Sequence, residues 1–313
     1  MKKDSKIYVA GHAGLAGSSI IRALTESGYT NIITRTRAEL DLLNQAAVAD
    51  FFATEKPAYV FLAAAKVGGI VANKTYPADF ISQNLRIQSN VIDSAHDNKV
   101  TKLLFLGSSC IYPKMADQPI KEEYLLTGPL EPTNEAYAIA KIAGLMLCKK
   151  YKEQYGDNFI SAMPTNLYGS EDNFHPTNSH PIPQIIRKFH EAKLAGAPSV
   201  GGFTDGTPLR EFLHVDDLGR ACVCLMEKYD DSMPVNVGTG SDLSMGEVIH
   251  MIARIVGYTG EILLDGTVPK GTPRKVLDVS RIHALGWRHT IELEEGIKTT
   301  YDWFKKQDSV RSV

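Results

Sequence analysis

The sequence predicts an α/β fold in which a doubly wound parallel sheet carries a smaller C-terminal lobe. The first half of the 313 residues alternates short apolar segments with longer amphipathic ones, which is typical of βαβ units that build a parallel sheet. The first apolar segment passes through a glycine-rich turn directly into a helical segment. After about Thr165 the alternation weakens and smaller elements follow, which predicts a second lobe.

The first lobe, residues 1–165, should contain short apolar strands and helices with one apolar face. The expected strands are Ile7–Ala10, Asn31–Thr34, Tyr59–Ala63, Lys102–Gly107 and Phe159–Pro164. The expected helices are Leu15–Ser27, Ala46–Glu55, Asp79–Asp97 and Tyr137–Tyr155. Right-handed crossovers between parallel strands then place helices on both faces of the sheet.

The second lobe covers mainly residues 166–313. It opens with a stretch rich in Asn, His, Pro and Ser, Tyr168–Ser179, which is typical of a loop. Helices are expected at Pro183–Lys193, Ser244–Val256 and Leu293–Lys305. A segment at roughly 214–230 is expected to return to the first lobe.

Composition and charge argue against several classes of protein. Lys and Arg number 34 against 36 Asp and Glu, a net charge of −2, which argues against a binder of nucleic acid or of membrane surfaces. No apolar run approaches the roughly 20 residues that cross a bilayer, and no signal peptide is expected. The four cysteines form no C-x-x-C pair, so reduced thiols in a cytoplasmic protein are expected.

The turn after the first strand has the spacing of a dinucleotide-binding (Rossmann) site. Gly11 suits a tight turn, Gly14 lets the backbone approach a pyrophosphate, and Gly17 lets the helix pack on the strand. The free N–H groups at the helix start, near Leu15, attract the anion. A plain strand-to-helix turn is the alternative, but the strand–turn–helix context favours a dinucleotide.

The second strand indicates which dinucleotide binds. An NAD site usually has an acid about 20 residues after the turn to accept the ribose 2′-OH. Here Arg35 and Arg37 follow the strand, and no acid comes before Glu39. Guanidinium groups can pair with a 2′-phosphate, so NADP(H) is the expected cofactor. Two solvated arginines are the alternative.

A Tyr-x-x-x-Lys pair, Tyr137 and Lys141, lies on an expected helix. Residues four apart share a helix face, so both can address one ligand. The lysine charge is expected to lower the pKa of the tyrosine, which can then give a proton to a carbonyl oxygen. Ser108, at the carboxyl end of an expected central strand, can bind the same oxygen.

These motifs, in this order, resemble the extended short-chain dehydrogenase/reductases over nearly the whole chain. The more specific resemblance is to members of that family that epimerise and reduce GDP-bound keto-sugars. It is carried by Ala63–Ile70, Gly107–Pro113, Glu131–Asn134, Pro164–Gly169, Asn173–Pro176 and Arg210–Asp217. The resemblance implies conversion of GDP-4-keto-6-deoxy-D-mannose to GDP-L-fucose, by epimerisation at C3 and C5 and NADPH-dependent reduction at C4. It also implies a homodimer.

The resemblance also implies roles for individual residues. Cys110 and His180 would be the acid/base pair of epimerisation; a small buried thiol and a loop histidine are the structural alternatives. Ser108 and Tyr137 would hold the C4 oxygen, with Lys141 on the cofactor ribose. The implied cofactor site comprises Gly11, Gly14, Leu15, Gly17, Arg35, Arg37, Asp41, Leu42, Ala64, Ala65, Tyr137, Lys141, Pro164, Asn166, Leu167 and His180. The implied substrate site comprises Ser108, Lys188, Phe203 and Arg210.

Three positions depart from the bacterial pattern of this group. Ala13 stands where those enzymes have an arginine that holds the NADP adenosine. Phe203 stands in place of a tryptophan. Lys188 stands in place of an arginine, so its phosphate contact would be a point charge.

Two rival functions remain open on the sequence. A nucleotide-sugar 4,6-dehydratase needs an acidic pair after the strand-end hydroxyl, where this chain has Ser109-Cys110-Ile111, and a 4-epimerase keeps its cofactor tightly bound. A non-catalytic NADP-sensing regulator would have lost proton-handling residues that are present here. The scattered histidines His175, His214, His283 and His289 lack the spacing of a metal site, so no metal is expected.

Overall fold

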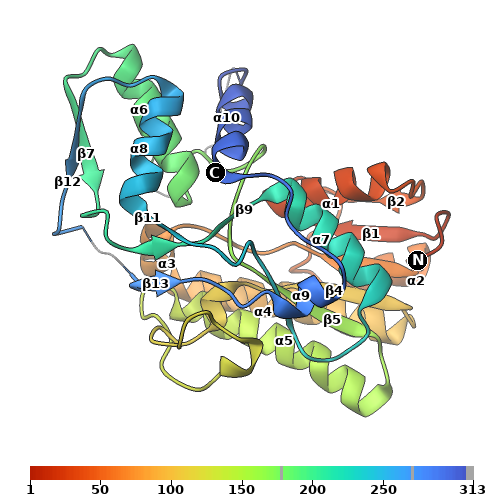
Figure 1. The fold of residues 1–313 in the computed structure, drawn as a ribbon. Coiled ribbons are helices and arrows are strands. Elements are labelled where there is room, and N and C mark those ends of the chain that lie inside the picture. Colours follow the sequence, from red (N-terminus) through yellow and green to blue (C-terminus); the bar gives the residue numbers. More distant parts are fainter. Residues whose placement is uncertain (177–178, 269–270, 308–313) are drawn as a thin grey trace.

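The computed structural model describes residues 1–176, 179–268 and 271–307. Its centre is a parallel sheet of six strands in the order β10-β5-β4-β3-β1-β2 (Figure 1). The strands are β1 (Ile7–Ala10), β2 (Ile32–Ile33), β3 (Tyr59–Leu62), β4 (Lys102–Leu106), β5 (Phe159–Pro164) and β10 (Val235–Val237). The predicted doubly wound parallel sheet is confirmed.

Helices cover both faces of this sheet. On one face α1 packs against α7, and on the other α4 packs against α5 and α2 (Figure 1). The bounds are α1 (Leu15–Glu26), α2 (Gln45–Glu55), α4 (Pro77–Asp97), α5 (Glu135–Tyr155) and α7 (Val215–Lys228). The central strands β1, β3, β4 and β5 are buried almost throughout, as expected of a parallel sheet covered on both sides.

The strand order reverses between β1 and β3. The chain leaves β1 for β2 on one side, and β3 then pairs on the opposite side of β1. At such a reversal the two loops diverge, and ligands of open α/β sheets bind in the gap. The glycine-rich turn follows β1 at this point.

A second lobe has its own hydrophobic core. It is built around α6 (Pro181–Leu194), α8 (Met245–Val256) and α10 (Leu293–Phe304), beside the paired strands β7 (Ser199–Phe203) and β12 (Glu261–Leu264) (Figure 1). Small sheets pair β8 (Leu209–Arg210) with β11 (Leu243–Ser244) and β13 (Arg274–Lys275), and β6 (Asn166–Tyr168) with β9 (Phe212–His214). Short helices are α3 (Ile70–Thr75), η1 (Ser109–Ile111), η2 (Glu122–Tyr124) and α9 (Ser280–Ala284).

The structure differs from the sequence prediction at a few element boundaries. Strand β2 is shorter than expected, and the sixth strand β10 was not predicted because three residues are too few to show a pattern. Helices α4 and α6 begin earlier, each with a proline in the first turn, where the missing N–H has no intrahelical partner to lose.

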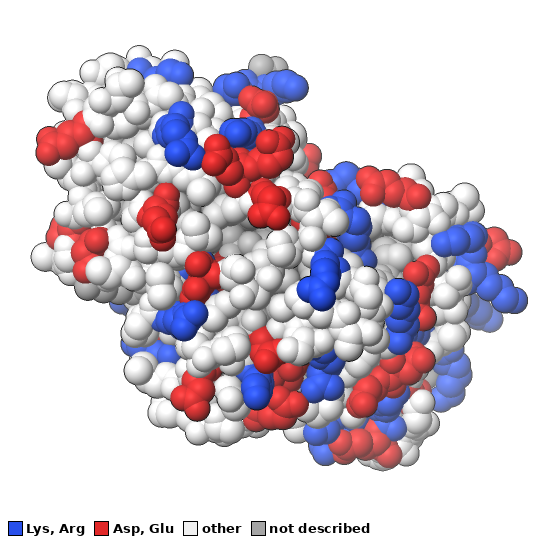
Figure 2. Space-filling model, viewed as in Figure 1, with Lys and Arg blue, Asp and Glu red and all other residues white. Residues whose placement is uncertain are grey.

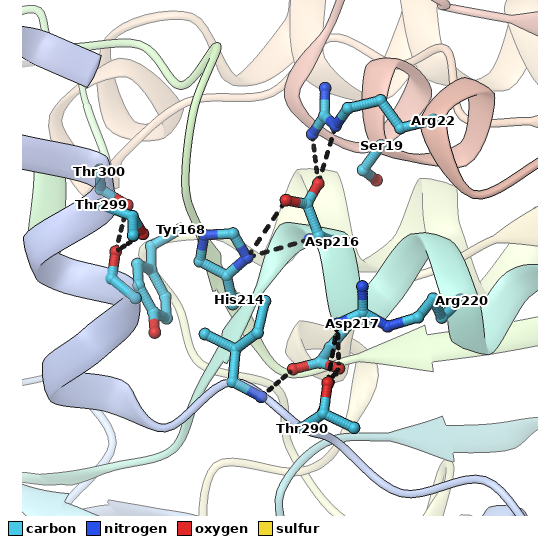
Figure 3. A network of polar contacts seen from close by, with 12 residues as sticks. Ser19, Arg22, Tyr168, His214, Asp216, Asp217, Arg220, Thr290, Thr299 and Thr300 are labelled. Carbon is cyan, nitrogen blue, oxygen red and sulfur yellow. Dashed lines mark hydrogen bonds and ion pairs between the residues drawn. The ribbon is translucent and has the colours of Figure 1, made fainter. Parts of the chain in front are cut away.

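A buried carboxylate, Asp217, joins α7 to the segment that precedes α10. Its oxygens accept hydrogen bonds from the N–H of Thr290 at 3.0 Å, from the N–H of Ile291 at 2.9 Å and from Arg220 at 2.8 Å (Figure 3). The neighbouring Asp216 is half-buried and pairs instead with Arg22 of α1 (Figure 3).

The surface shows no segregation of charge on the face drawn in Figure 2, where basic and acidic side chains are interspersed. Within the described ranges, no helix combines the length and apolar character needed to span a membrane.

Candidate active site

Two glycines of the turn after β1, Gly11 and Gly17, are packed too closely to carry a side chain. Gly11 has a φ of +85°, and a Cβ there would lie 2.7 Å from the backbone of Ala64. A Cβ on Gly17 would lie 2.1 Å from the carbonyl oxygen of Gly11. Helix α1 starts at Leu15, and its N-cap Gly14 provides no side-chain cap. The turn therefore leaves backbone N–H groups open to an anion, as a pyrophosphate requires.

The residues expected to read the cofactor ribose lie at the end of β2. The guanidinium of Arg35 pairs with Glu55 of α2 at 2.5 Å and lies 5.3 Å from the ring centre of Phe51. Arg37 is 78% exposed. Glu39 turns back and accepts a hydrogen bond from the N–H of Thr36 at 2.7 Å. Arg35 is thus held in place by Glu55. Glu39, the first acid after the strand, uses its carboxylate in a hydrogen bond within its own loop.

The other predicted cofactor residues border the same edge of the sheet. Ala64 and Ala65 follow β3, and Pro164 ends β5. Asn166 and Leu167 lie in β6, where the side-chain amide of Asn166 donates to the carbonyl oxygen of Glu211 at 2.7 Å. Asp41 and Leu42 lie in the loop between β2 and α2. Their contact with a cofactor stays a prediction.

Ser108, Tyr137 and Lys141 come together where β4 ends and α5 begins. Ser108 follows the end of β4 and hydrogen-bonds Tyr137 of the first turn of α5. Lys141, one turn further along, is buried and donates to the carbonyl oxygen of Leu106 at 2.8 Å. The helical spacing of Tyr137 and Lys141 and the position of Ser108 after β4 therefore bring the three predicted residues together.

The predicted effect of Lys141 on the pKa of Tyr137 is wrong for the protein alone. Burial, and then the charge of Cys110, raise the pKa of Tyr137, while its hydrogen bond with Ser108 acts in the opposite direction. Burial lowers the pKa of Lys141 itself to about 7, because the charged form loses its hydration. Tyr137 therefore keeps its proton at neutral pH, which is the form that can protonate a carbonyl oxygen.

Cys110 is half-buried two residues after Ser108, and Lys275 lies beside it. The Nζ of Lys275 is 3.8 Å from the Sγ of Cys110. Lys275 belongs to β13, which pairs with β8 so that Lys275 lies opposite Arg210. Arg210 also interacts electrostatically with Cys110, while burial lowers the pKa of its guanidinium. Two cationic side chains are thus gathered at this thiol.

His180 immediately precedes α6 and is paired with an acid. Its Nδ1 lies 3.5 Å from the Oδ1 of Asp172, a side chain that is only 3% exposed. Burial lowers the pKa of His180, but the nearby carboxylate of Asp172 raises it, and the net result lies above the ordinary value despite the opposing charge of Lys275. His180 is therefore suited to act as an acid, and Lys275 acts on both members of the predicted acid/base pair.

Lys188 and Phe203 lie in the second lobe. The Nζ of Lys188 donates to the carbonyl oxygens of Gly201 at 3.1 Å and Gly202 at 3.4 Å, and it lies 4.8 Å from the ring centre of Phe203. Phe203 is 5% exposed and packs on Phe189 in the second core. A direct contact of Phe203 with substrate stays a prediction.

Three residues near the site escaped the sequence analysis: Lys275, Asp172 and Glu211. Glu211 is fully buried, and its carboxylate accepts hydrogen bonds from the N–H of Thr239 at 2.6 Å and of Leu277 at 2.9 Å. It thereby ties the strand that carries Lys275 to the strand that carries the preceding Arg210. The one usable sequence signal was for Glu211, an acid within an apolar strand motif. Such an acid needs several hydrogen-bond donors when it is buried.

Among the described residues, no group of three or more His, Cys, Asp or Glu side chains is arranged to hold a metal ion. All four cysteines are free.

Comparisons with known proteins identify the family of the chain. The model of the NAD dependent epimerase/dehydratase family matches residues 7–238. The GDP-L-fucose synthase of Escherichia coli K12 is 55% identical over 98% of this chain and 98% of its own length. A GDP-6-OMe-4-keto-L-xylo-heptose reductase from C. jejuni superposes with a TM-score of 0.94 at 41% identity, covering 98% of this chain and 99% of its own. A GDP-L-fucose synthetase from Naegleria fowleri, solved with NADP bound, superposes with a TM-score of 0.90 at 28% identity, covering 98% and 95%. The chain therefore belongs to the NAD dependent epimerase/dehydratase family.

Proposed function

We propose that this enzyme converts GDP-4-keto-6-deoxy-D-mannose to GDP-L-fucose, by epimerisation at C3 and C5 followed by reduction at C4. The observation that carries this function is the near full-length identity of 55% to a GDP-L-fucose synthase. The Ser108–Tyr137 pair and the cationic surroundings of Cys110 support it. NADP(H) is the cofactor: a related synthetase is solved with NADP bound, and the glycine turn here leads into a helix whose N-terminus has no side-chain cap.

Epimerisation next to a ketone removes a proton from one face of a carbon and returns one to the other face. Cys110, as thiolate, would take the proton, and His180, whose protonated form is favoured by Asp172, would supply the replacement. The enolate oxygen that forms in between needs hydrogen-bond donors. Ser108 and the protonated Tyr137 would supply them, and their proximity to each other supports this role.

Reduction at C4 reuses the same oxygen. Bound NADPH supplies the hydride. Tyr137 would give its proton to the carbonyl oxygen, with Ser108 fixing the position of that oxygen. Lys141, one turn along α5 and buried under Tyr137, would bind the cofactor ribose.

A direct assay tests the reaction. Purified protein mixed with GDP-4-keto-6-deoxy-D-mannose and NADPH should oxidise one NADPH for each GDP-L-fucose formed, measured by absorbance and by identification of the product. Binding of NADPH without oxidation would overturn the function and leave only the fold.

Two variants test the separate roles of the site. Cys110→Ser should lose exchange of ring hydrogens with solvent while NADPH binding is kept. Tyr137→Phe should lower hydride transfer by about 10²–10⁴-fold. Normal exchange in the first variant, or normal reduction in the second, would remove that residue from the mechanism.

The two lobes divide the binding between them in this proposal. Residues 1–165, with roughly 214–230, would form the NADP-binding domain, and 166–313 would mainly bind the GDP-sugar. The packing of α7 on α1 and the separate second core support this division. Calorimetric titration tests it: Arg35→Ala should weaken NADPH binding alone, and Lys188→Met should weaken GDP binding alone. The opposite pattern would refute the division.

A cytoplasmic homodimer is the proposed state of the protein. The helices α4 and α5 lie together, and Ile139 of α5 is 43% exposed, an apolar group that a partner would cover. Sedimentation equilibrium should give about twice the chain mass of 34.4 kDa, and Ile139→Glu should return the mass to that of one chain. A single-chain mass for the parent would contradict the dimer, and recovery with membranes would contradict the location.

A further inference from the structure

A small polar cavity lies beside Cys110. It has a volume of about 30 Å³ and is lined in part by Cys110, Glu131, Asn134, Thr272 and Lys275. About 10–15 Å³ suffices for one water, provided that the site offers polar partners. This cavity therefore has room for one or two waters next to the sulfur.

One residue of the cavity wall, Asn134, has a side-chain atom without a partner. The Oδ1 of Asn134 is buried and accepts no hydrogen bond within the described structure. A buried acceptor without a donor is costly, and bound water is the usual remedy. The Nζ of Lys275, 3.8 Å from the Sγ of Cys110, supplies a donor in the same wall. A water between these groups would lie against the sulfur.

Glu131, which also lines the cavity, connects it to an exposed lysine. This carboxylate is 9% exposed. Its Oε2 accepts a hydrogen bond from the N–H of Thr133 at 2.8 Å, and its Oε1 lies 3.7 Å from the Nζ of Lys114. The side chain of Lys114 is 36% exposed. A proton that reaches Glu131 is thus close to bulk water.

The proposed reaction creates a need for such a route. Each epimerisation leaves Cys110 as thiol and His180 as neutral imidazole, so the pair must be recharged before the second carbon can react. Substrate in front of Cys110 excludes bulk water from that side. The thiol proton must therefore leave by another path, or the second epimerisation stalls.

We infer that water held by Asn134 and Lys275 in this cavity carries the proton from Cys110 to Glu131 and out to solvent between the two epimerisations. The S–H bond breaks, the thiolate is restored, and the proton passes through water to the carboxylate. His180 regains a proton from solvent separately, so charge and atoms balance. This inference rests on the proposed function, and it gives Asn134 and Glu131 a part in the epimerase half alone.

Exchange and hydride transfer can be measured separately to test this relay. Exchange is followed by NMR as uptake of deuterium at C3 and C5 of GDP-4-keto-6-deoxy-D-mannose in D₂O with NADP⁺, where no reduction occurs. Hydride transfer is followed in reverse as oxidation of GDP-L-fucose by NADP⁺, which does not use Cys110. The ratio of the exchange rate to the hydride-transfer rate therefore separates an effect on the relay from an effect common to both reactions.

Asn134→Leu fills the cavity with an apolar group and should lower this ratio about tenfold or more, the size of a lost proton-transfer step. Asn134→Ser, which keeps a polar group and space for water, should keep most of the ratio that the parent shows. Glu131→Gln, which keeps its shape and its bond to Thr133, should lower the ratio in the same way.

Asn134 lies three residues before Tyr137, so a merely structural disturbance of α5 would slow both reactions and leave the ratio unchanged. That result, or full exchange in Asn134→Leu and Glu131→Gln, would overturn the relay alone. A parent protein that exchanges no hydrogen at C3 or C5 would overturn the epimerase half of the proposed function, and the relay with it.

Discussion

At the scale of single residues, the surroundings of two ionisable groups move their pKa values in opposite directions. Burial lowers the pKa of Lys141 to about 7, whereas Asp172 raises that of His180 against the effect of burial. Both shifts make the stability of the fold depend on pH, and the dependence has the opposite sign in the two cases.

Lys141→Met should remove a pH dependence of stability. The unfolded chain binds a proton at Lys141 up to its ordinary pKa of 10.5, but the folded chain releases it near 7. Between these values the unfolded state holds more protons, so the stability of the parent rises with pH. Thermal unfolding without cofactor from pH 6 to 9 should show this rise weakened in the variant. Identical pH slopes in parent and variant would contradict the burial of a neutral lysine.

Asp172→Asn should move the pH profile of epimerisation. Asp172 favours protonated His180, so the acid function persists to higher pH in the parent. Without this charge the alkaline limb should shift to lower pH. The same pairing stabilises the fold below the ordinary pKa of histidine and is lost as pH rises through the raised value. Deuterium uptake at C3 and C5, measured from pH 6 to 9, checks the shift; an unmoved limb would exclude Asp172 as the partner.

Residue chemistry was only partly predictable from the sequence. Tyr137 and Lys141 could be paired because helical spacing fixes their geometry. Asp172 and Lys275 could not be joined to His180 and Cys110 in this way, because Lys275 reaches Cys110 only through the pairing of β13 with β8. Such long-range pairing leaves no local pattern in the chain.

At the scale of elements, the strand–turn–helix unit of β1 and α1 gives its glycines distinct tasks. A Cβ on Gly17 would collide with the carbonyl oxygen of Gly11 at 2.1 Å, whereas a Cβ on Gly14 would meet the same oxygen at 3.4 Å. Gly17 is therefore required by packing, while Gly14 has room on the protein side and is free to serve the approach of the cofactor.

The pair Gly17→Ala and Gly14→Ala should separate these tasks. Gly17→Ala should destabilise the fold by about 1–3 kcal/mol, the usual cost of overpacking. Gly14→Ala should leave the unfolding midpoint within a few degrees of the parent but weaken NADPH binding about tenfold or more. Thermal unfolding and fluorescence titration with NADPH measure the two effects. Equal effects of both substitutions on stability would contradict this assignment.

The elements themselves were predicted best where they are long and periodic. Helices such as α5 and α8 lie within about two residues of their expected bounds, which is usual for helix ends. The three-residue strand β10 was missed, although it extends the central sheet beside β5. β10 pairs with β5 because the chain returns from the second lobe to the central sheet. Such a return leaves no periodic pattern in the sequence.

At the scale of the whole molecule, Asp217 holds the segment before α10 on α7. It is fully buried and bonds Thr290, Ile291 and Arg220 (Figure 3). Its neighbour Asp216 makes a half-exposed ion pair with Arg22. The two adjacent aspartates thus offer a matched comparison of buried and exposed charge.

Asp217→Asn should cost about 2–4 kcal/mol of unfolding free energy, because an amide cannot accept bonds on both sides and leaves buried donors unpaired. Asp216→Asn should cost less than about 1 kcal/mol. Denaturant unfolding of both variants without cofactor gives the two values. A cost for Asp217→Asn as small as that for Asp216→Asn would show that the buried carboxylate does not hold this segment.

The proposed function has one site both epimerise and reduce a GDP-bound keto-sugar, rather than only reduce it. The most direct measurement is the reaction of GDP-4-keto-6-deoxy-D-mannose with NADPH in D₂O, followed by the position of deuterium in the product. The proposed function requires GDP-L-fucose with deuterium at C3 and C5 and ordinary hydrogen, from NADPH, at C4. A reduced product without deuterium at C3 and C5 would contradict it and identify the protein as a reductase alone.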